Sequence, residues 1–202
     1  MSDPAVEPLV ESAVESAVEP PVAQVPDMLG REILARVRDV PDYPTPGVLF
    51  KDITPLLADG PAFAAVVEAI AAPHRDPGAQ VDVVVGIEAR GFIFAAPVAV
   101  ALGVGFVPVR KVGKLPFSTV GAAYELEYGT AEVEMHADGV RPGQRVLLVD
   151  DVLATGGTAG AAAGLVQQLG GVITRVTVLM ELSFLSGRQR LNGTEVRALV
   201  SI

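Results

Sequence analysis

One stretch of the sequence is more informative than any other: Val146-Leu147-Leu148-Val149-Asp150-Asp151-Val152-Leu153-Ala154-Thr155-Gly156-Gly157-Thr158. It begins with four branched apolar residues, which are typical of a strand buried on both faces of a parallel α/β sheet. We expect that strand to end at Asp150 and Asp151, followed by a glycine-rich turn and a helix of small residues around 159–169. Ligands of open α/β sheets bind just beyond the carboxyl ends of the strands, so this order predicts a binding site there.

Each part of this stretch suits a different group of a phosphorylated sugar. Two adjacent carboxylates are acceptors only, so they can take the hydroxyl protons of a vicinal diol such as that of ribose. The N–H groups at the start of the helix converge with the positive end of its dipole, which favours a phosphate. Gly156 and Gly157 let the backbone approach such an anion, and Thr155 and Thr158 add hydroxyl donors. An Asp-Asp pair alone is usually a solvated loop, and Gly-Gly alone is usually a turn; their combination in this order favours the phosphosugar site.

This stretch also matches the phosphoribosyl-diphosphate (PRPP) motif of the type I phosphoribosyltransferases. Four further segments resemble the adenine phosphoribosyltransferase family, namely residues 42–54, 86–92, 110–116 and 124–129. The resemblance covers about residues 28–200. It implies an α/β fold with a central, mostly parallel sheet flanked by helices, a small N-terminal hood and a flexible lid hairpin. It also implies the reaction of adenine with PRPP to give AMP and diphosphate. The residues that it assigns to the ribose and the 5′-phosphate are Asp150, Asp151, Ala154, Thr155, Gly156, Gly157 and Thr158.

A second turn before a helix predicts a second anion site. Residues 86–91 read Gly-Ile-Glu-Ala-Arg-Gly, and the planar guanidinium of Arg90 suits phosphate oxygens. In the family this turn holds the diphosphate, so the resemblance assigns Glu88, Ala89 and Arg90 to it. The alternative for Arg90 is a surface arginine at a helix start.

The basic loop of residues 110–119 reads as a lid with Gly113 as its hinge. Closing it brings Lys111 and Lys114 to the diphosphate and excludes water from an oxocarbenium-like centre.

Phe50 is the candidate platform for the purine. An aromatic face stacks on a base with a gain of about 0.5–1.5 kcal/mol beyond area burial. In the family the residues that match Val48, Phe50 and Lys51 contact the base, with Leu182 on the opposite face of the ring. Lys51 stands where many members have arginine, and the family contact there is through the backbone. Without the resemblance, Phe50 could be an ordinary core residue.

The resemblance also supplies a candidate for proton transfer. The family's matching glutamate lies near the base, which makes Glu127 a catalytic candidate beside Arg90, with Tyr128 packing close by. A glutamate in an exposed hairpin is the competing interpretation. The leaving diphosphate needs its charge neutralised, so we expect Mg²⁺, held mainly through PRPP and water with no direct protein ligand. Family members pair, so we also expect a homodimer.

Composition narrows the class of protein. The chain has 202 residues, half of them apolar, which is enough for one sizeable core over residues 28–202. It has no cysteine, which excludes disulfides and thiolate metal sites. No run of about 18 apolar residues occurs and the N-terminus is acidic, so we expect a soluble cytoplasmic protein with no membrane contact.

Net charge argues against nucleic acid as a partner. The segment 1–27 holds six acids and no base, which leaves −3 of the total −9 for the rest of the chain. Neither part has the clustered basic face that nucleic acid needs. The basic residues at 110–114 suffice for a diphosphate only.

The segment 1–27 is predicted to be a disordered acidic tail. Residues 5–24 repeat a four-residue pattern that would place four glutamates at i,i+4 in a helix, where like charges oppose it by about 0.2–0.5 kcal/mol each. Prolines bracket the repeat. The alternative is a partner-binding segment with a valine stripe.

Periodicity predicts the remaining elements. We expect helices over 28–40, with Asp27 as N-cap and Pro41 as stop, over 61–72 and over 91–102. Strands are expected over 81–87, 105–110, 145–149, 172–179 and 196–200, with a hairpin of 124–128 and 131–135 around residues 129–130. His74 and His136 are interpreted as surface or structural residues.

Two other functions remain to be weighed. A phosphoribosyltransferase for hypoxanthine, guanine or xanthine would need an acidic residue or lysine to recognise an exocyclic oxygen, whereas this chain has the hood around Phe50. A regulator on the same fold would need a DNA-binding domain or a basic face, and the sequence shows neither.

Overall fold

The structure, a computed structural model, describes residues 28–125, 130–191 and 193–202. The described elements follow in this order: α1 Met28–Leu34, β1 Arg38–Val40, β2 Phe50–Asp52, α2 Thr54–Ala58, α3 Gly60–Ala71, a 3-10 turn at Ala72–Arg75, β3 Val83–Ile87, α4 Gly91–Leu102, β4 Gly105–Lys111, β5 Thr119–Glu125, β6 Thr130–His136, β7 Arg145–Leu153, α5 Gly157–Gln168, β8 Val172–Glu181, 3-10 turns at Ser183–Leu185 and Gly187–Leu191, and β9 Val196–Ser201.

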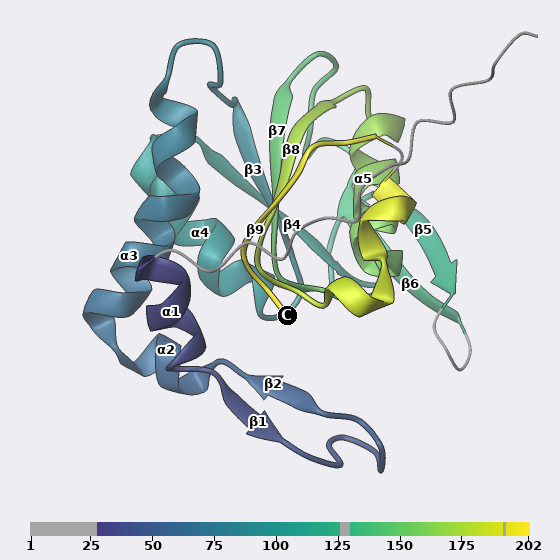
Figure 1. Cartoon of the computed structure of the whole chain (residues 1–202). Helices are drawn as coiled ribbons and strands as arrows, with labels where there is room; N and C mark the ends of the chain where they lie inside the picture. The colour runs from purple at the N-terminus through teal and green to yellow at the C-terminus, as the bar shows by residue number, and fades with distance from the viewer. Residues whose placement is uncertain (1–27, 126–129, 192) are drawn as a thin grey trace, which may run out of the picture.

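A seven-stranded sheet forms the centre of the molecule (Figure 1), in the order β5-β6-β4-β3-β7-β8-β9. Strands β4, β3, β7, β8 and β9 run parallel to one another, and the β5–β6 hairpin joins this group through antiparallel pairing of β6 with β4. Both faces of the central strands are buried, as expected from their continuous apolar runs. The expected central, mostly parallel sheet flanked by helices is confirmed.

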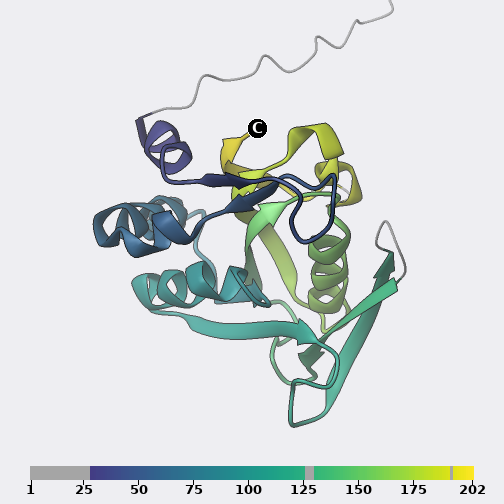
Figure 2. The same ribbon diagram turned by 90° about the horizontal axis from the view of Figure 1, so that it is seen from below.

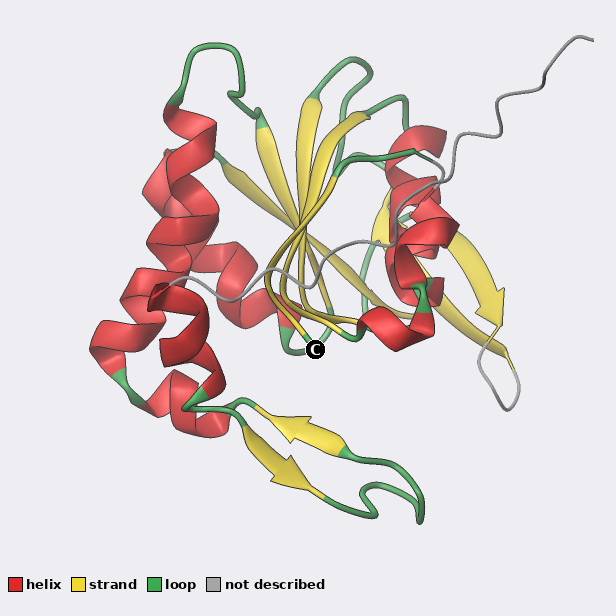
Figure 3. Ribbon diagram, viewed as in Figure 1, coloured by secondary structure: helices red, strands yellow, loops and turns green. Residues whose placement is uncertain are grey.

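Helices cover the two faces of this sheet (Figure 3). On one face, α5 packs over a cluster that includes Val85 and Leu148; on the other, α3 and α4 pack over a cluster that includes Val84 and Leu147. Neighbouring residues of one strand thus serve opposite clusters, which is the period-two alternation of a strand. In the part of the chain that is described, no helix has the length and apolarity to cross a membrane.

The N-terminal helix is shorter than predicted. It ends at Leu34, and the residues before Pro41 form β1, which pairs antiparallel with β2. Lys51 Nζ bonds Asp39 Oδ1 at 2.7 Å across the pair, and a residue before proline is disfavoured in the helical region. The predicted helix over 35–40 is therefore wrong, and the two-stranded ribbon was not anticipated. Asp27, its proposed N-cap, lies outside the described residues.

This β1–β2 ribbon extends across the end at which the parallel strands finish (Figure 2), so it occupies the position expected of the hood. At one edge of the seven-stranded sheet, β5 begins at Thr119 rather than at 124, and β4 ends at Lys111, so the predicted basic loop of residues 110–119 covers 112–118 in the structure. The turn of that hairpin, residues 126–129, lies outside the described residues, as does the predicted tail over 1–27. The predicted helices over 61–72 and 91–102 and the strands predicted over 81–87, 105–110, 172–179 and 196–200 agree with the structure within two residues at each end, whereas the strand predicted over 145–149 extends to Leu153.

Candidate functional site

The two adjacent carboxylates lie inside β7 rather than after it. The strand continues to Leu153, which corrects the prediction that it ends at Asp150 and Asp151. Pairing with β8 continues through Leu153↔Glu181, and this extends β7 beyond its apolar run. Asp151 is 5% exposed, and its N–H donates to Asp150 Oδ1 at 2.9 Å. Both carboxylates therefore stand on a rigid central strand, which fixes their position better than a loop would.

Burial dominates the electrostatics of this pair. It raises the pKa of Asp150 well above its ordinary value, and the adjacent charge of Asp151 adds to the rise. It also raises the pKa of Asp151, against the opposing effect of the Arg90 cation. Two adjacent carboxylates that have lost most of their hydration do not readily carry two negative charges, so they favour a ligand that brings hydroxyl donors or positive charge.

Arg90 contacts this pair from the start of α4. Its Nε lies 2.6 Å from Asp151 Oδ2, but the N–H is not aligned with that oxygen, so Oδ2 receives no hydrogen bond from the described residues. The guanidinium carbon also lies 4.9 Å from the centroid of the Phe50 ring, over its face. Arg90 therefore touches both the carboxylate pair and the aromatic platform, which the sequence did not predict.

A glycine allows α4 to begin directly against β7. A Cβ at Gly91 would lie 2.6 Å from Asp150 Oδ1 and 3.0 Å from the carbonyl oxygen of Val149. Only a residue without a side chain leaves room for this approach. The turn that precedes α4, which includes the cis peptide between Glu88 and Ala89, is thereby placed beside the carboxylate pair.

The glycine-rich turn after β7 forms the start of α5 as predicted. Gly156 has φ +79° and is followed by the helix from Gly157, whose first-turn N–H groups have no partner within the helix. The backbone of Gly187 packs directly on this turn, because a Cβ on either Gly156 or Gly187 would collide with backbone of the other segment. Arg188, next to it, bonds the buried Glu181 through Nε at 2.6 Å and Nη2 at 2.7 Å.

This support of the turn by Gly187 was missed from the sequence. The two segments in contact are separated along the chain by the whole of α5 and β8. A single Gly-Arg pair in the sequence does not indicate such a contact. A glycine that follows the short 3-10 turn after β8 was the only available hint.

The predicted diphosphate turn lies beside the basic loop. The basic loop supplies donors to the carboxylate of Glu88: Arg110 Nε and Nη2 donate to it at 3.2 Å each, and Lys111 N–H donates at 3.0 Å. Burial alone would raise the pKa of Glu88, but these donors outweigh it and lower the pKa. Lys111 and Lys114 have exposed side chains. Glu88 thus joins the two predicted diphosphate segments through Arg110.

A cavity of about 160 Å³ lies under the β1–β2 ribbon. Its lining brings together all four residues predicted to contact the base and adds three more: Val48, Leu49, Phe50, Lys51, Arg90, Val152 and Leu182. The ring of Tyr43 meets that of Phe50 edge to face at 5.0 Å. The ammonium group of Lys51 already has a partner on the ribbon, because its Nζ donates to Asp39 Oδ1 at 2.7 Å.

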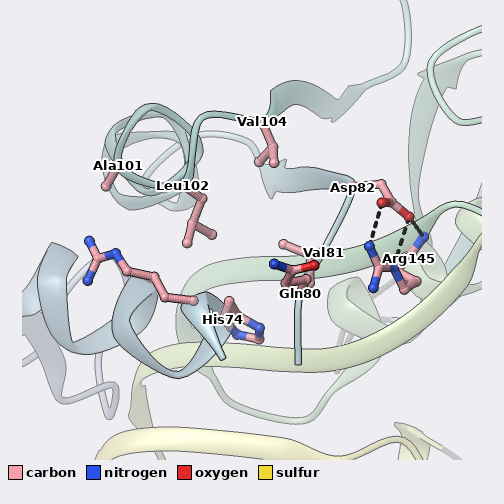
Figure 4. A pocket seen from close by; sticks show the side chains of 9 residues that line it. His74, Gln80, Val81, Asp82, Ala101, Leu102, Val104 and Arg145 are labelled. Carbon is pink, nitrogen blue, oxygen red and sulfur yellow. Dashed lines mark hydrogen bonds and ion pairs between the residues drawn. The ribbon is translucent and has the colours of Figure 1, made fainter. Parts of the chain in front are cut away.

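A second cavity, of about 510 Å³, lies at the opposite end of the sheet, where β3 and β7 begin (Figure 4). Its charged side chains pair with one another or with neighbours: Asp82 accepts from Arg145 at 2.8 Å, and Arg75 pairs with Glu68. His74 is 5% exposed and its Nδ1 lies 2.9 Å from the carbonyl oxygen of Ala79. Its interpretation as a structural residue is confirmed, and this larger cavity is remote from the carboxylate pair.

The geometry agrees with the comparisons with known proteins. The profile of the phosphoribosyl transferase domain matches residues 56–189. The adenine phosphoribosyltransferase of Thermobifida fusca is 60% identical over 166 residues, which span 82% of this chain and 93% of that protein. The chain belongs to the adenine phosphoribosyltransferase family.

Solved structures of the same family have the same fold. The crystal structure from Thermoanaerobacter pseudethanolicus gives a TM-score of 0.82 at 50% identity and covers 85% of this chain and 99% of that one. The family's enzyme from Saccharomyces cerevisiae, complexed with an imino-altritol bisphosphate and adenine, gives 0.81 at 40% identity, covering 85% of this chain and 98% of that one. The type I phosphoribosyltransferase fold predicted from the sequence is thus confirmed.

Of the predicted site residues, those on β7, the α5 turn, the α4 turn and the ribbon meet at one end of the sheet. Glu127 and Tyr128 lie outside the described residues. Among the residues that are described, no three acidic or histidine side chains gather as a metal site. The carboxylate oxygens of Asp150 and Asp151 are nevertheless the hard donors that suit Mg²⁺ through bound water or a sugar hydroxyl.

Proposed function

We propose that the protein transfers the 5-phosphoribosyl group from PRPP to adenine and releases AMP and diphosphate. One observation carries this proposal: the adjacent carboxylates of Asp150 and the buried Asp151, a glycine-rich helix start and an apolar cavity with an aromatic wall all lie at the same end of the sheet. These three sites match ribose, 5′-phosphate and purine in chemistry. Membership of the family supports the same assignment.

PRPP binds along the carboxyl end of β7. Asp150 and Asp151 accept the 2′- and 3′-hydroxyls of the ribose; Oδ2 of Asp151 forms an ion pair with Arg90 but accepts no hydrogen bond from the described residues. The turn over residues 154–158 and the first N–H groups of α5 hold the 5′-phosphate, with the hydroxyls of Thr155 and Thr158 as further donors. Gly156 lets this backbone approach the anion closely.

The diphosphate binds between the α4 turn and the basic loop. The backbone at Glu88 and Ala89, the guanidinium of Arg90 and the ammonium groups of Lys111 and Lys114 receive its oxygens. Mg²⁺ held by PRPP and water would neutralise charge on this leaving group. The chain's own cations and N–H groups stabilise the same charge as the bond to the anomeric carbon breaks, so catalysis is mainly positioning and electrostatics.

Adenine occupies the cavity under the ribbon. Phe50 and Leu182 supply apolar contact, while the backbone of Val48 and Lys51 reads the polar edge of the base. Glu127 assists the loss of the purine proton as the new bond forms. Exclusion of water by the ribbon and the basic loop protects the oxocarbenium-like centre.

Kinetics with each substrate varied separately test the PRPP site. Asp150→Asn and Asp151→Asn each remove a charged acceptor, which contributes about 1.5–3 kcal/mol and corresponds to about 10- to 100-fold in kcat/KM for PRPP. The KM for adenine should change much less. Unchanged KM for PRPP and unchanged kcat in both variants would overturn the assignment of these carboxylates to the ribose.

We also propose a cytoplasmic homodimer. Its support is the resemblance to a family whose members pair. Sedimentation at micromolar concentration should give about twice the 20.9 kDa mass of one chain. A mass near one chain at that concentration would count against the dimer.

A further inference from the structure

A buried carboxylate that the proposed reaction does not use lies beneath the basic loop. Glu134 belongs to β6 and faces Arg110 across the β4–β6 pairing. It is only 6% exposed, whereas Glu132 on the same strand is exposed. Burial of a carboxylate is unfavourable unless hydrogen-bond donors replace the lost water.

The donors come from the basic loop itself. The N–H groups of Lys114 and Leu115 each lie 3.0 Å from Oε1 of Glu134, and Gly113 N–H and the Thr119 hydroxyl also donate. Burial alone would raise the pKa of Glu134, but these hydrogen bonds outweigh it and lower the pKa. Consecutive N–H groups of this kind form a nest that binds anions. Here the anion is a carboxylate of the protein.

Arg110 connects this nest to the diphosphate turn. Its Nη1 donates to the carbonyl oxygen of Lys114 at 3.1 Å, while its Nε and Nη2 donate to Glu88. The N–H of Lys111 donates to the same carboxylate of Glu88. The backbone that carries both lysines is therefore tied at one end to Glu88 and at the other to Glu134.

We infer that Glu134 is a positioning residue, which fixes the backbone of the basic loop so that Lys111 and Lys114 face the diphosphate of PRPP. This inference rests on the proposed function. A loop ordered before binding loses less conformational entropy when the ligand arrives, so its effect falls on affinity for the ligand that it contacts. Adenine, which occupies the cavity beside Phe50, has no contact with this loop in the proposed arrangement.

The test compares Glu134→Gln and Glu134→Ala with a matched control, Glu132→Gln, in the full-length protein. KM for PRPP and for adenine, inhibition constants for diphosphate and AMP, and thermal melting are measured for each. The glutamine variant keeps an oxygen that can accept from the N–H groups of Lys114 and Leu115 but loses the charge that strengthens these hydrogen bonds. It should raise KM for PRPP about fivefold, or about 1 kcal/mol, and the alanine variant about tenfold or more.

The inhibition constant for diphosphate should rise by the same factor as KM for PRPP, whereas KM for adenine and the inhibition constant for AMP stay within about twofold. The Glu132→Gln control should match the wild type in both KM values and both inhibition constants. A role in stability alone would lower the melting temperature or kcat and leave the ratio of the two KM values unchanged; that result overturns the inference. If the alanine variant does not fold, the glutamine variant decides by the same criteria.

Failure of the inference can be told from failure of the proposed function. Calorimetric titration of each protein with diphosphate and Mg²⁺ needs no turnover and should show the same weakening. Wild-type protein that makes AMP, together with a Glu134→Gln variant of unchanged diphosphate affinity, overturns only the role of Glu134. Wild-type protein that makes no AMP and binds no diphosphate overturns both.

Discussion

Replacement of Gly91 by alanine tests how the site is assembled. An added Cβ would lie 2.6 Å from Asp150 Oδ1, 3.0 Å from the Val149 carbonyl oxygen and 3.1 Å from the Cα of Asp150. Ordinary contact for a carbon atom begins at about 3.5 Å, so α4 and β7 must separate by roughly 1 Å or the carboxylate must rotate away. Two of the three obstacles are backbone of a central strand, so rotation alone does not remove the clash.

Two opposing effects determine how far Gly91→Ala changes the stability of the fold. Alanine is a better helix former than glycine by up to about 1 kcal/mol, and overpacking of a dense interior costs about 1–3 kcal/mol. We expect Gly91→Ala to lower the free energy of unfolding by about 1–2 kcal/mol, or the melting temperature by about 2–8 °C for a chain of this size. Displacement of the reacting groups by about 1 Å can reduce kcat/KM for PRPP by about 100-fold.

Gly164→Ala is the matched control. Gly164 lies within α5, is exposed, and has no atom within 4 Å of an added Cβ. The free energy of unfolding of this variant should rise by about 0.5–1 kcal/mol, and its activity should be unchanged. Urea unfolding and PRPP kinetics of both variants are the assay. If Gly91→Ala is as stable and as active as Gly164→Ala, α4 does not depend on close approach to β7 and our description of the site is wrong.

Four further variants test other parts of the account. Asp150→Asn should raise the free energy of unfolding at pH 7 while activity falls, because the raised pKa of Asp150 means that its charge opposes folding. That gain should vanish in unfolding measured below pH 3.8, where Asp150 is protonated in both states. Asp82→Asn should instead lower the free energy of unfolding. Arg145 lowers the pKa of Asp82 to about 2, so the ion pair stabilises the fold above pH 3.8 and this contribution is lost as the pH falls toward 2. The loss at pH 7 should be under about 1 kcal/mol, because the pair is exposed to solvent. Phe50→Ala should raise KM for adenine about two- to tenfold, more than KM for PRPP, in kinetics with each substrate varied. Gly187→Ala should raise KM for PRPP and lower the melting temperature, since a Cβ there meets backbone of Ala154 and Gly156; a variant with wild-type values in both would remove Gly187 from the site.

The parts of the fold that the sequence predicted are those that local pattern determines. The run Val146–Val149 is apolar without interruption because both faces of β7 are covered, and Gly156 with Gly157 marks the turn because only a small residue suits it. The residues of the turn between β7 and α5, and those of the turn before α4, were predicted in the same way. Each lies where an apolar run meets a glycine, so a short window of sequence contains the whole signal.

What the sequence did not predict depends on contacts between distant segments. The strands of the β1–β2 ribbon have only three residues each, and charged pairs such as Lys51 with Asp39 link them across the ribbon. They show no alternation of apolar and polar residues from which a strand could be predicted. Gly187 supports the α5 turn from beyond the end of β8, a separation that no short window of sequence spans. Glu134 lies two residues from the exposed Glu132 on the same strand, so the sequence suggests an exposed side chain, and only the structure shows that it is buried and bonded to the basic loop.

The choice of base tests the central claim most directly. Purified protein is incubated with PRPP and Mg²⁺ and with adenine, hypoxanthine or guanine in parallel, and the nucleotides are separated by chromatography. The apolar cavity beside Phe50 and the chain's membership of the family predict AMP from adenine, with kcat/KM at least about a hundredfold above that for either other base. Formation of IMP or GMP at the rate of AMP, or of no nucleotide from any base, would mean that this end of the sheet does not carry adenine phosphoribosyl transfer.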